Sequence, residues 1–243
     1  MRAINIFKSA AHVFLKSDYD GKGKLVTIRQ LQKAWRKSEI DGEGAIWVNA
    51  DCLNVILRTT KINARIITDQ LGADSDAVAY IDKKKYIYGP KVLEIIADQS
   101  LENSSDTKEI YLEISQDMYR QIWFSSDAKQ QRADNRNSIG KALKGLKDKR
   151  QKLYSITHDE LTGEPLRGDS EFSHIKSKHI YRAYQLSVEN GLIVNKETHR
   201  IITANDVKDE NDLKELCEKM GWKLDWYDEY SRWIQSFDAD SGE

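Results

Sequence analysis

Two short strand patterns followed by one helix pattern, between residues 155 and 203, constrain the fold of this chain most. Residues 171–175 form a short β-prone stretch that contains a histidine. After a loop, residues 188–194 combine an Asn-Gly turn with an apolar strand, and Asn195 can cap a helix that contains His199. The sequence therefore predicts a β-hairpin followed directly by a helix.

Histidines are concentrated in the same region. Four of the five lie between residues 158 and 199, namely His158, His174, His179 and His199. A neutral imidazole with an ordinary pKa of ~6.5 can accept a proton near neutral pH, and it is also a common metal ligand. Each histidine alone is more typical of a structural role, but their clustering predicts a metal or acid–base site.

Four motifs in this region occur in an informative order. They are Thr162-Gly163, Ser173-His174-Ile175-Lys176, Asn190-Gly191-Leu192 and His199. With 16 positions from His174 to Asn190 and nine from Asn190 to His199, the set resembles the HNH, or ββα-metal, nucleases, in the variant without zinc-knuckle cysteines. The resemblance covers residues 155–220. Cys52 and Cys217 have no Cys-x-x-Cys partners, which fits that variant.

The resemblance implies a role for each of the three motif residues. His174 is expected to be the general base that deprotonates the attacking water, and His199 a metal ligand. Asn190 is expected to bridge the two hairpin strands and hold the backbone of His174 in place. The predicted catalytic residues are therefore His174, which acts as the base, and Asn190, which positions it.

The metal ligands are less completely specified. Ser173 stands where these nucleases commonly carry Asp or His, and Thr203 stands where some carry a further histidine. Glu171 or Asp169 can supply a carboxylate, and Glu171 shares a face with Ser173 if the hairpin is regular. We therefore expect His199, Ser173 and Glu171 to hold a divalent cation with water ligands, with Mg²⁺ as the expected ion and Mn²⁺ as the alternative.

Charge is segregated along the chain although the net charge is only −1. Residues 127–152, which have a helical pattern, carry nine basic and three acidic side chains, whereas residues 204–243 carry five basic and twelve acidic ones. The basic segment is either a solvated helix or an arm that grips phosphates. The candidate nucleic-acid contacts are Lys144, Lys147, Arg150, Lys176, Lys178, Arg182, Lys196 and Arg200.

The first half of the chain has no such motif. The apolar spacing predicts a helix over residues 3–16, a helix over 61–72, a lysine-tipped hairpin over 77–89, a helix from Pro90 and a strand over 109–114. A helix beside a basic hairpin occurs in winged DNA-binding domains, but a generic α+β core has the same pattern.

Taken together, these patterns predict an α+β protein. We expect a mixed α/β DNA-recognition region over residues 1–105, a strand and basic helical connector over 106–154, and a ββα-metal nuclease domain with an acidic helical extension over 155–243. No secretory signal and no apolar run of transmembrane length are present, so a cytoplasmic location is expected.

The predicted function is metal-dependent cleavage of double-stranded DNA, as in a sequence-specific restriction enzyme that acts as a homodimer. Two alternatives stay open. One is a DNA-binding regulator of the phage antirepressor type with an inactive HNH domain, and the other is a homing or nonspecific HNH nuclease.

Overall fold

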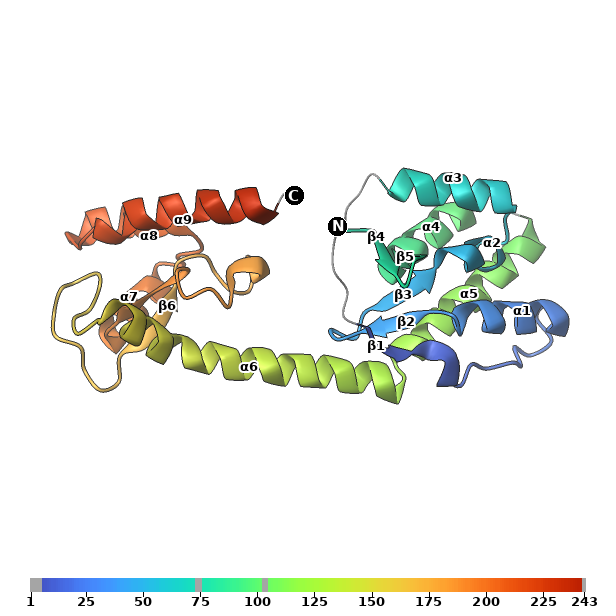
Figure 1. The fold of residues 1–243 in the computed structure, drawn as a ribbon, viewed down its shortest axis with the longest axis horizontal. Helices are drawn as coiled ribbons and strands as arrows, with labels where there is room; N and C mark the ends of the chain where they lie inside the picture. Colours follow the sequence, from blue (N-terminus) through green and yellow to red (C-terminus); the bar gives the residue numbers. More distant parts are fainter. Residues whose placement is uncertain (1–5, 73–75, 102–104, 242–243) are drawn as a thin grey trace. The chain divides into compact units, whose positions relative to one another are not determined.

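The computed structural model describes residues 6–72, 76–101 and 105–241. The fold is α+β, as predicted, and its sheets are antiparallel (Figure 1). The chain divides into two compact units, Met1–Arg136 and Asn137–Glu243. The boundary falls within the long helix α6 (Ser126–Tyr154), which covers the predicted basic helix. Each unit contains its own hydrophobic core.

The first unit is built on a five-stranded antiparallel sheet in the order β1-β2-β3-β5-β4. The strands are β1 (Ile6–Ser9), β2 (Glu39–Asp41), β3 (Ile46–Asn49), β4 (Val78–Ile81) and β5 (Lys84–Tyr88). The helices are η1 (Ala10–His12), α1 (Leu25–Trp35), η2 (Ala50–Cys52), α2 (Leu53–Ile56), α3 (Lys61–Leu71), α4 (Gly89–Leu101) and α5 (Asp106–Trp123).

The core of this unit joins four helices to the sheet. Leu31 of α1, Ile56 of α2, Ile96 of α4 and Leu112 of α5 are fully buried together with Ile87 of β5. Burial of such side chains stabilises a fold by about 1.5–3 kcal/mol each. These contacts, rather than any single hydrogen bond, hold the helices on the sheet.

The predicted helix over residues 3–16 is wrong for the part that the structure describes, and residues 3–5 lie outside the described residues. Strand β1 pairs with β2, and η1 follows it. Val13 and Leu15 are buried whereas Phe14 is 82% exposed, so burial alternates with the period of an extended chain. Gln32 keeps this segment extended, because its Nε2 donates to the carbonyl of Leu15 at 2.8 Å.

The predicted strand over residues 109–114 is also wrong, because these residues belong to α5. Ser105 caps this helix by accepting from the backbone N–H of Lys108. The buried positions Leu112, Ser115, Tyr119 and Ile122 then recur every three or four residues. The alternation over residues 109–114 covers only six positions, whereas the helical spacing of buried residues continues to Ile122.

The predicted hairpin is confirmed. Strands β4 and β5 pair in register from Val78 opposite Ile87 to Ile81 opposite Lys84. Asp82 and Lys83 form the turn with φ of 48° and 64°, the left-handed conformation that a two-residue hairpin turn requires. Helix α4 then starts at Gly89, beside Pro90, as predicted.

The second unit contains the predicted hairpin and helix. Its elements are β6 (Glu171–His174), η3 (Arg182–Tyr184), β7 (Gly191–Val194), α7 (Lys196–Ala204), α8 (Glu210–Met220) and α9 (Asp225–Ser241). Leu192 and Val194 of β7 pack in one core with Ile202 of α7, Leu213 of α8 and Trp226 of α9. The helices thereby fix the position of the hairpin within this unit.

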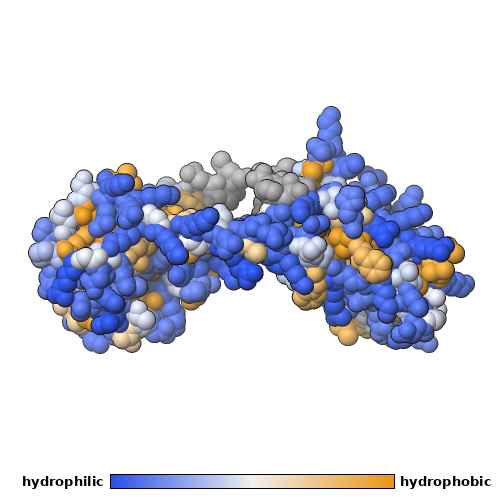
Figure 2. All heavy atoms as spheres, turned by 90° about the horizontal axis from the view of Figure 1, so that it is seen from below, coloured by the Kyte–Doolittle hydropathy of each residue, from blue (hydrophilic) through white to orange (hydrophobic). Residues whose placement is uncertain are grey.

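The surface of α6 is mostly hydrophilic, as expected from its composition (Figure 2). Among the residues that the structure describes, no helix combines the length and apolar character needed to cross a bilayer.

Candidate active site on the β6–β7–α7 element

Strands β6 and β7 pair in a regular antiparallel register. Glu171 lies opposite Val194, and Ser173 lies opposite Leu192. Because side chains alternate along a strand, Glu171 and Ser173 share the face that Leu192 and Val194 bury against α7. His174 projects from the opposite face. The two faces therefore separate the predicted base from the predicted carboxylate ligand.

The ring of His174 is held by a backbone carbonyl. Its Nε2 lies 3.0 Å from the carbonyl oxygen of Gln185. A carbonyl can only accept, so Nε2 carries the proton and, in the neutral ring, Nδ1 is the available proton acceptor. Phe172 packs edge-on against the ring at 5.0 Å between centroids.

The electrostatic surroundings favour the neutral form of His174. Burial lowers the pKa of the ring, and the positive charge of Lys178 lowers the pKa further. The hydrogen bond to Gln185 acts in the opposite direction, and His199 and His179 contribute smaller lowering effects. A half-buried histidine with a depressed pKa is neutral at pH 7, which is the form a general base needs.

Asn190 positions the segment that follows β6. Its buried side chain accepts from the N–H of Lys176 at 2.9 Å, and its amide donates to the carbonyl of Lys176 at 3.1 Å and to that of Tyr184 at 3.2 Å. Tyr230 donates its hydroxyl to the same amide oxygen. Asn190 thus holds both ends of the loop that contains Gln185.

Glu171 and His199 form the second part of the site. Nδ1 of His199 on α7 is in direct contact with Oε2 of Glu171 on β6, and both side chains are partly exposed. His199 has a small lowering effect on the pKa of His174, although Glu171 and His174 project from opposite faces of β6. A carboxylate beside an imidazole is a suitable pair of donors for a divalent cation.

The metal set is smaller than predicted. Ser173 is only 4% exposed, and exposed Asp169 contacts neither histidine. Within the described ranges, no group of three His, Cys, Asp or Glu side chains is arranged to hold a metal. Glu171 and His199 therefore fit only an ion that keeps several water ligands, as Mg²⁺ does.

Three of the predicted phosphate contacts are engaged within the fold. Arg150 donates to Glu160 from both Nε and Nη2 and to the carbonyl of Val188 from Nη1. Lys147 donates to the carbonyl of Ser170, and Lys176 pairs with Glu210. Because these three side chains already have partners within the fold, they are no longer candidates for contact with DNA.

The other predicted cations are free for an external anion. No ion pair forms at these side chains in the described part of the chain: Lys144, Lys178, Arg182, Lys196 and Arg200. The positive charge of Lys178 lowers the pKa of His174, and Lys196 and Arg200 lie close to His199 in the sequence of α7. These cations are candidates for contact with a phosphate at the site.

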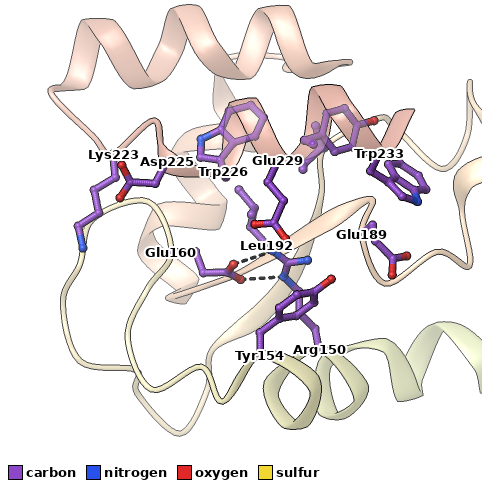
Figure 3. A pocket seen from close by; sticks show the side chains of 12 residues that line it. Arg150, Tyr154, Glu160, Glu189, Leu192, Lys223, Asp225, Trp226, Glu229 and Trp233 are labelled. Carbon is purple, nitrogen blue, oxygen red and sulfur yellow. Dashed lines mark hydrogen bonds and ion pairs between the residues drawn. The ribbon is translucent and has the colours of Figure 1, made fainter. Parts of the chain in front are cut away.

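A pocket of about 400 Å³ lies in the second unit, lined by the end of α6 and by α9 (Figure 3). The guanidinium of Arg150 lies between Glu160 and the ring of Tyr154, and Glu229 points toward it from α9 (Figure 3). Glu189 and Asp225 add two further carboxylates to the lining. This acidic lining disfavours phosphate, and none of the histidines is present.

Sequence reasoning missed the buried carboxylate of Asp159. One oxygen accepts from the N–H groups of Leu161 and Thr162, and the other accepts from the N–H of Asn195 and the hydroxyl of Thr198. Asn195 occupies the N-cap position of α7, as predicted, but its side chain makes no capping bond. The cap is supplied by Asp159, which is 36 residues away.

No family model, no curated protein and no solved structure matches this chain.

Proposed function

We propose that this protein is a metal-dependent DNA endonuclease whose active site lies on β6, β7 and α7, with the arrangement of a ββα-metal nuclease. The observation that carries the proposal is the orientation of His174. The carbonyl of Gln185 accepts from Nε2 and leaves Nδ1 available, burial favours the neutral ring, and the Glu171–His199 pair lies on the other face of the same hairpin.

The proposed chemistry is hydrolysis of a phosphodiester bond. His174 accepts through Nδ1 the proton of the water that attacks phosphorus, and the 3′-oxygen leaves in line with that attack. Lys178 stabilises the negative charge of the phosphate near the ring. Asn190 acts as a positioning residue, because it holds the loop that orients His174.

Glu171 and His199 would hold the divalent cation. When bound, the cation offsets the negative charge that develops at the scissile phosphate and at the leaving oxygen. We propose Mg²⁺ as the natural ion, with Mn²⁺ as a substitute, because two protein donors leave most positions to water.

The metal donors provide the test of this function. Supercoiled plasmid should be nicked in Mg²⁺ or Mn²⁺ and remain intact in EDTA, and Glu171→Gln or His199→Ala should raise the metal concentration needed for half-maximal rate. Glu197→Gln is the matched control, since Glu197 lies on α7 but pairs with Arg167. Absence of nicking with every divalent ion, together with intact DNA binding, would identify instead a DNA-binding regulator.

Sequence specificity and dimerisation are part of the same proposal. One site of this type cuts one strand, so a double-strand break calls for two copies of the chain. Sequencing the ends of cleaved DNA distinguishes a restriction enzyme, which gives one short fixed site, from a homing or nonspecific nuclease.

A further inference from the structure

A basic groove crosses the first unit between α1 and the connection from α2 to α3. Its volume is about 560 Å³. The cations that line it are Lys33, Lys37, Arg58 and Lys61, and the one carboxylate in the lining is that of Asp51. The groove therefore concentrates positive charge in a unit that contains none of the predicted catalytic residues.

Among the described residues, the four cations of the basic groove have no acidic partner. No ion pair joins them to a carboxylate in the part of the chain that the structure describes. Elsewhere in the same unit, lysines such as Lys85 and Lys8 pair with Asp69 and Asp127. Unpaired like charges held together in one groove favour the binding of an external anion.

Arg58 is held ready for such an anion. Its backbone has φ of 52° at the end of α2, a conformation in which glycine or asparagine is usual. Its guanidinium stacks on the ring of buried Tyr111 at 5.0 Å and makes no hydrogen bond within the described residues. All of its N–H donors are thus free, while the stacking restricts the orientation of the group.

The form of the groove favours the backbone of a nucleic acid. Lys33 lies in the last turn of α1 and Lys37 lies just beyond the end of that helix, so both cations come to the groove from the same segment of the chain. The groove also contains the amides of Gln30 and Asn54 and the hydroxyl of Thr59, which suit phosphate and sugar oxygens. No large exposed apolar side chain lines it, so a lipid surface would gain little.

We propose that the basic groove binds the phosphate backbone of duplex DNA and thereby makes the first unit a DNA-binding module. The inference goes beyond the proposed function, because binding in the groove requires neither His174 nor a metal. Bound phosphates would displace counterions, so each lost cation should weaken the salt dependence of binding.

The test measures binding of the full-length chain in EDTA, which prevents cleavage. The probe is a mixed-sequence duplex of about two helical turns, followed by fluorescence anisotropy across a range of salt concentrations. Lys33→Gln/Lys37→Gln should lower the slope of log K against log[salt] by about 2 and weaken binding about tenfold or more at low salt. Both side chains are exposed, so the melting temperature should stay unchanged.

The matched control is Lys83→Gln/Lys84→Gln at the β4–β5 hairpin, which removes the same charge and tests whether the hairpin contacts DNA as in a winged domain. The slope of log K against log[salt] for this control should equal that of the unmodified chain. An unchanged slope in the groove variant, an equal fall in both variants, or no duplex binding by the unmodified chain would overturn the proposal. Binding to vesicles with anionic lipid but not to DNA would overturn it in favour of a membrane surface.

Discussion

At the residue scale, the proposed roles of His174 and Asn190 depend on which of their polar atoms are hydrogen-bonded within the fold. His174 has one ring nitrogen bonded and one available, whereas every polar group of the Asn190 side chain is bonded within the fold. The first pattern is that of a reacting group, and the second is that of a positioning residue. The two residues therefore predict different experimental outcomes.

The pKa of His174 predicts the acid limb of the pH–rate profile. Burial and the charge of Lys178 lower this pKa below the ordinary value of about 6.5. Only the neutral ring accepts a proton, so the acid limb of kcat/KM should have its midpoint below about 6.5. A limb with its midpoint above this value would show that another group, or a His174 in different surroundings, acts as the base.

Replacing Asn190 should affect stability as well as rate. Asn190→Ala leaves the backbone groups of Lys176 and the carbonyl of Tyr184 without their partners, which should cost about 3 kcal/mol in the free energy of unfolding by urea denaturation. Asn205→Ala, at an exposed position, should cost less than about 0.5 kcal/mol. Equal losses of unfolding free energy in the two variants would contradict the positioning role of Asn190.

At the element scale, the β6–β7–α7 succession was predictable because its signals are local. An Asn-Gly turn, two short β-prone runs and an N-cap position lie within about 30 residues of sequence and act on adjacent backbone. The Glu171–His199 contact was only partly predictable, since it required the hairpin to be regular and α7 to pack on β6.

The features that the sequence did not predict depend on contacts between residues that are distant in the sequence. Residues 6–9 and 13–15 are extended on either side of η1, and β2 and Gln32, both distant in sequence, supply hydrogen bonds to these segments. Asp159 caps α7 across 36 residues, and no local pattern marks that bond. The cations of the basic groove come together from α1 and the α2–α3 connection, and their spacing in the sequence carries no signal of this.

The long-range cap makes a prediction about α7. Asp159→Asn replaces a charged oxygen that accepts two hydrogen bonds with a group that either donates or accepts less strongly, so we expect a loss of about 2 kcal/mol and faster amide hydrogen exchange in the first turn of α7. Exposed Asp169→Asn should change neither quantity. Unaltered exchange at α7 in Asp159→Asn would show that the carboxylate does not secure this helix.

At the scale of the whole molecule, the candidate site and the basic groove belong to different units. The second unit contains His174 and the Glu171–His199 pair, and the first contains the basic groove. The net charge of −1 conceals this division, because acidic residues 204–243 balance the basic segments. Each unit has its own core, so substitutions in the groove need not disturb the site.

One site in each chain predicts the order in which the strands are cut. At low protein concentration, nicked circles should accumulate before linear plasmid, and at high concentration linear plasmid should form directly as two copies act together. Gel analysis of the time course, with the oligomeric state measured by sedimentation, tests this. Direct linearisation at concentrations where the protein is monomeric would contradict it.

The most direct test of the central claim is single-turnover cleavage of bound DNA in Mg²⁺ by His174→Ala and by His158→Ala, with DNA affinity measured alongside. His158 is an exposed histidine of the same unit whose ring contacts Thr157. The account predicts that His174→Ala binds DNA normally but cleaves it at least about 100-fold more slowly, while His158→Ala retains the rate of the unmodified chain. Cleavage by His174→Ala at the rate of the unmodified chain would contradict it.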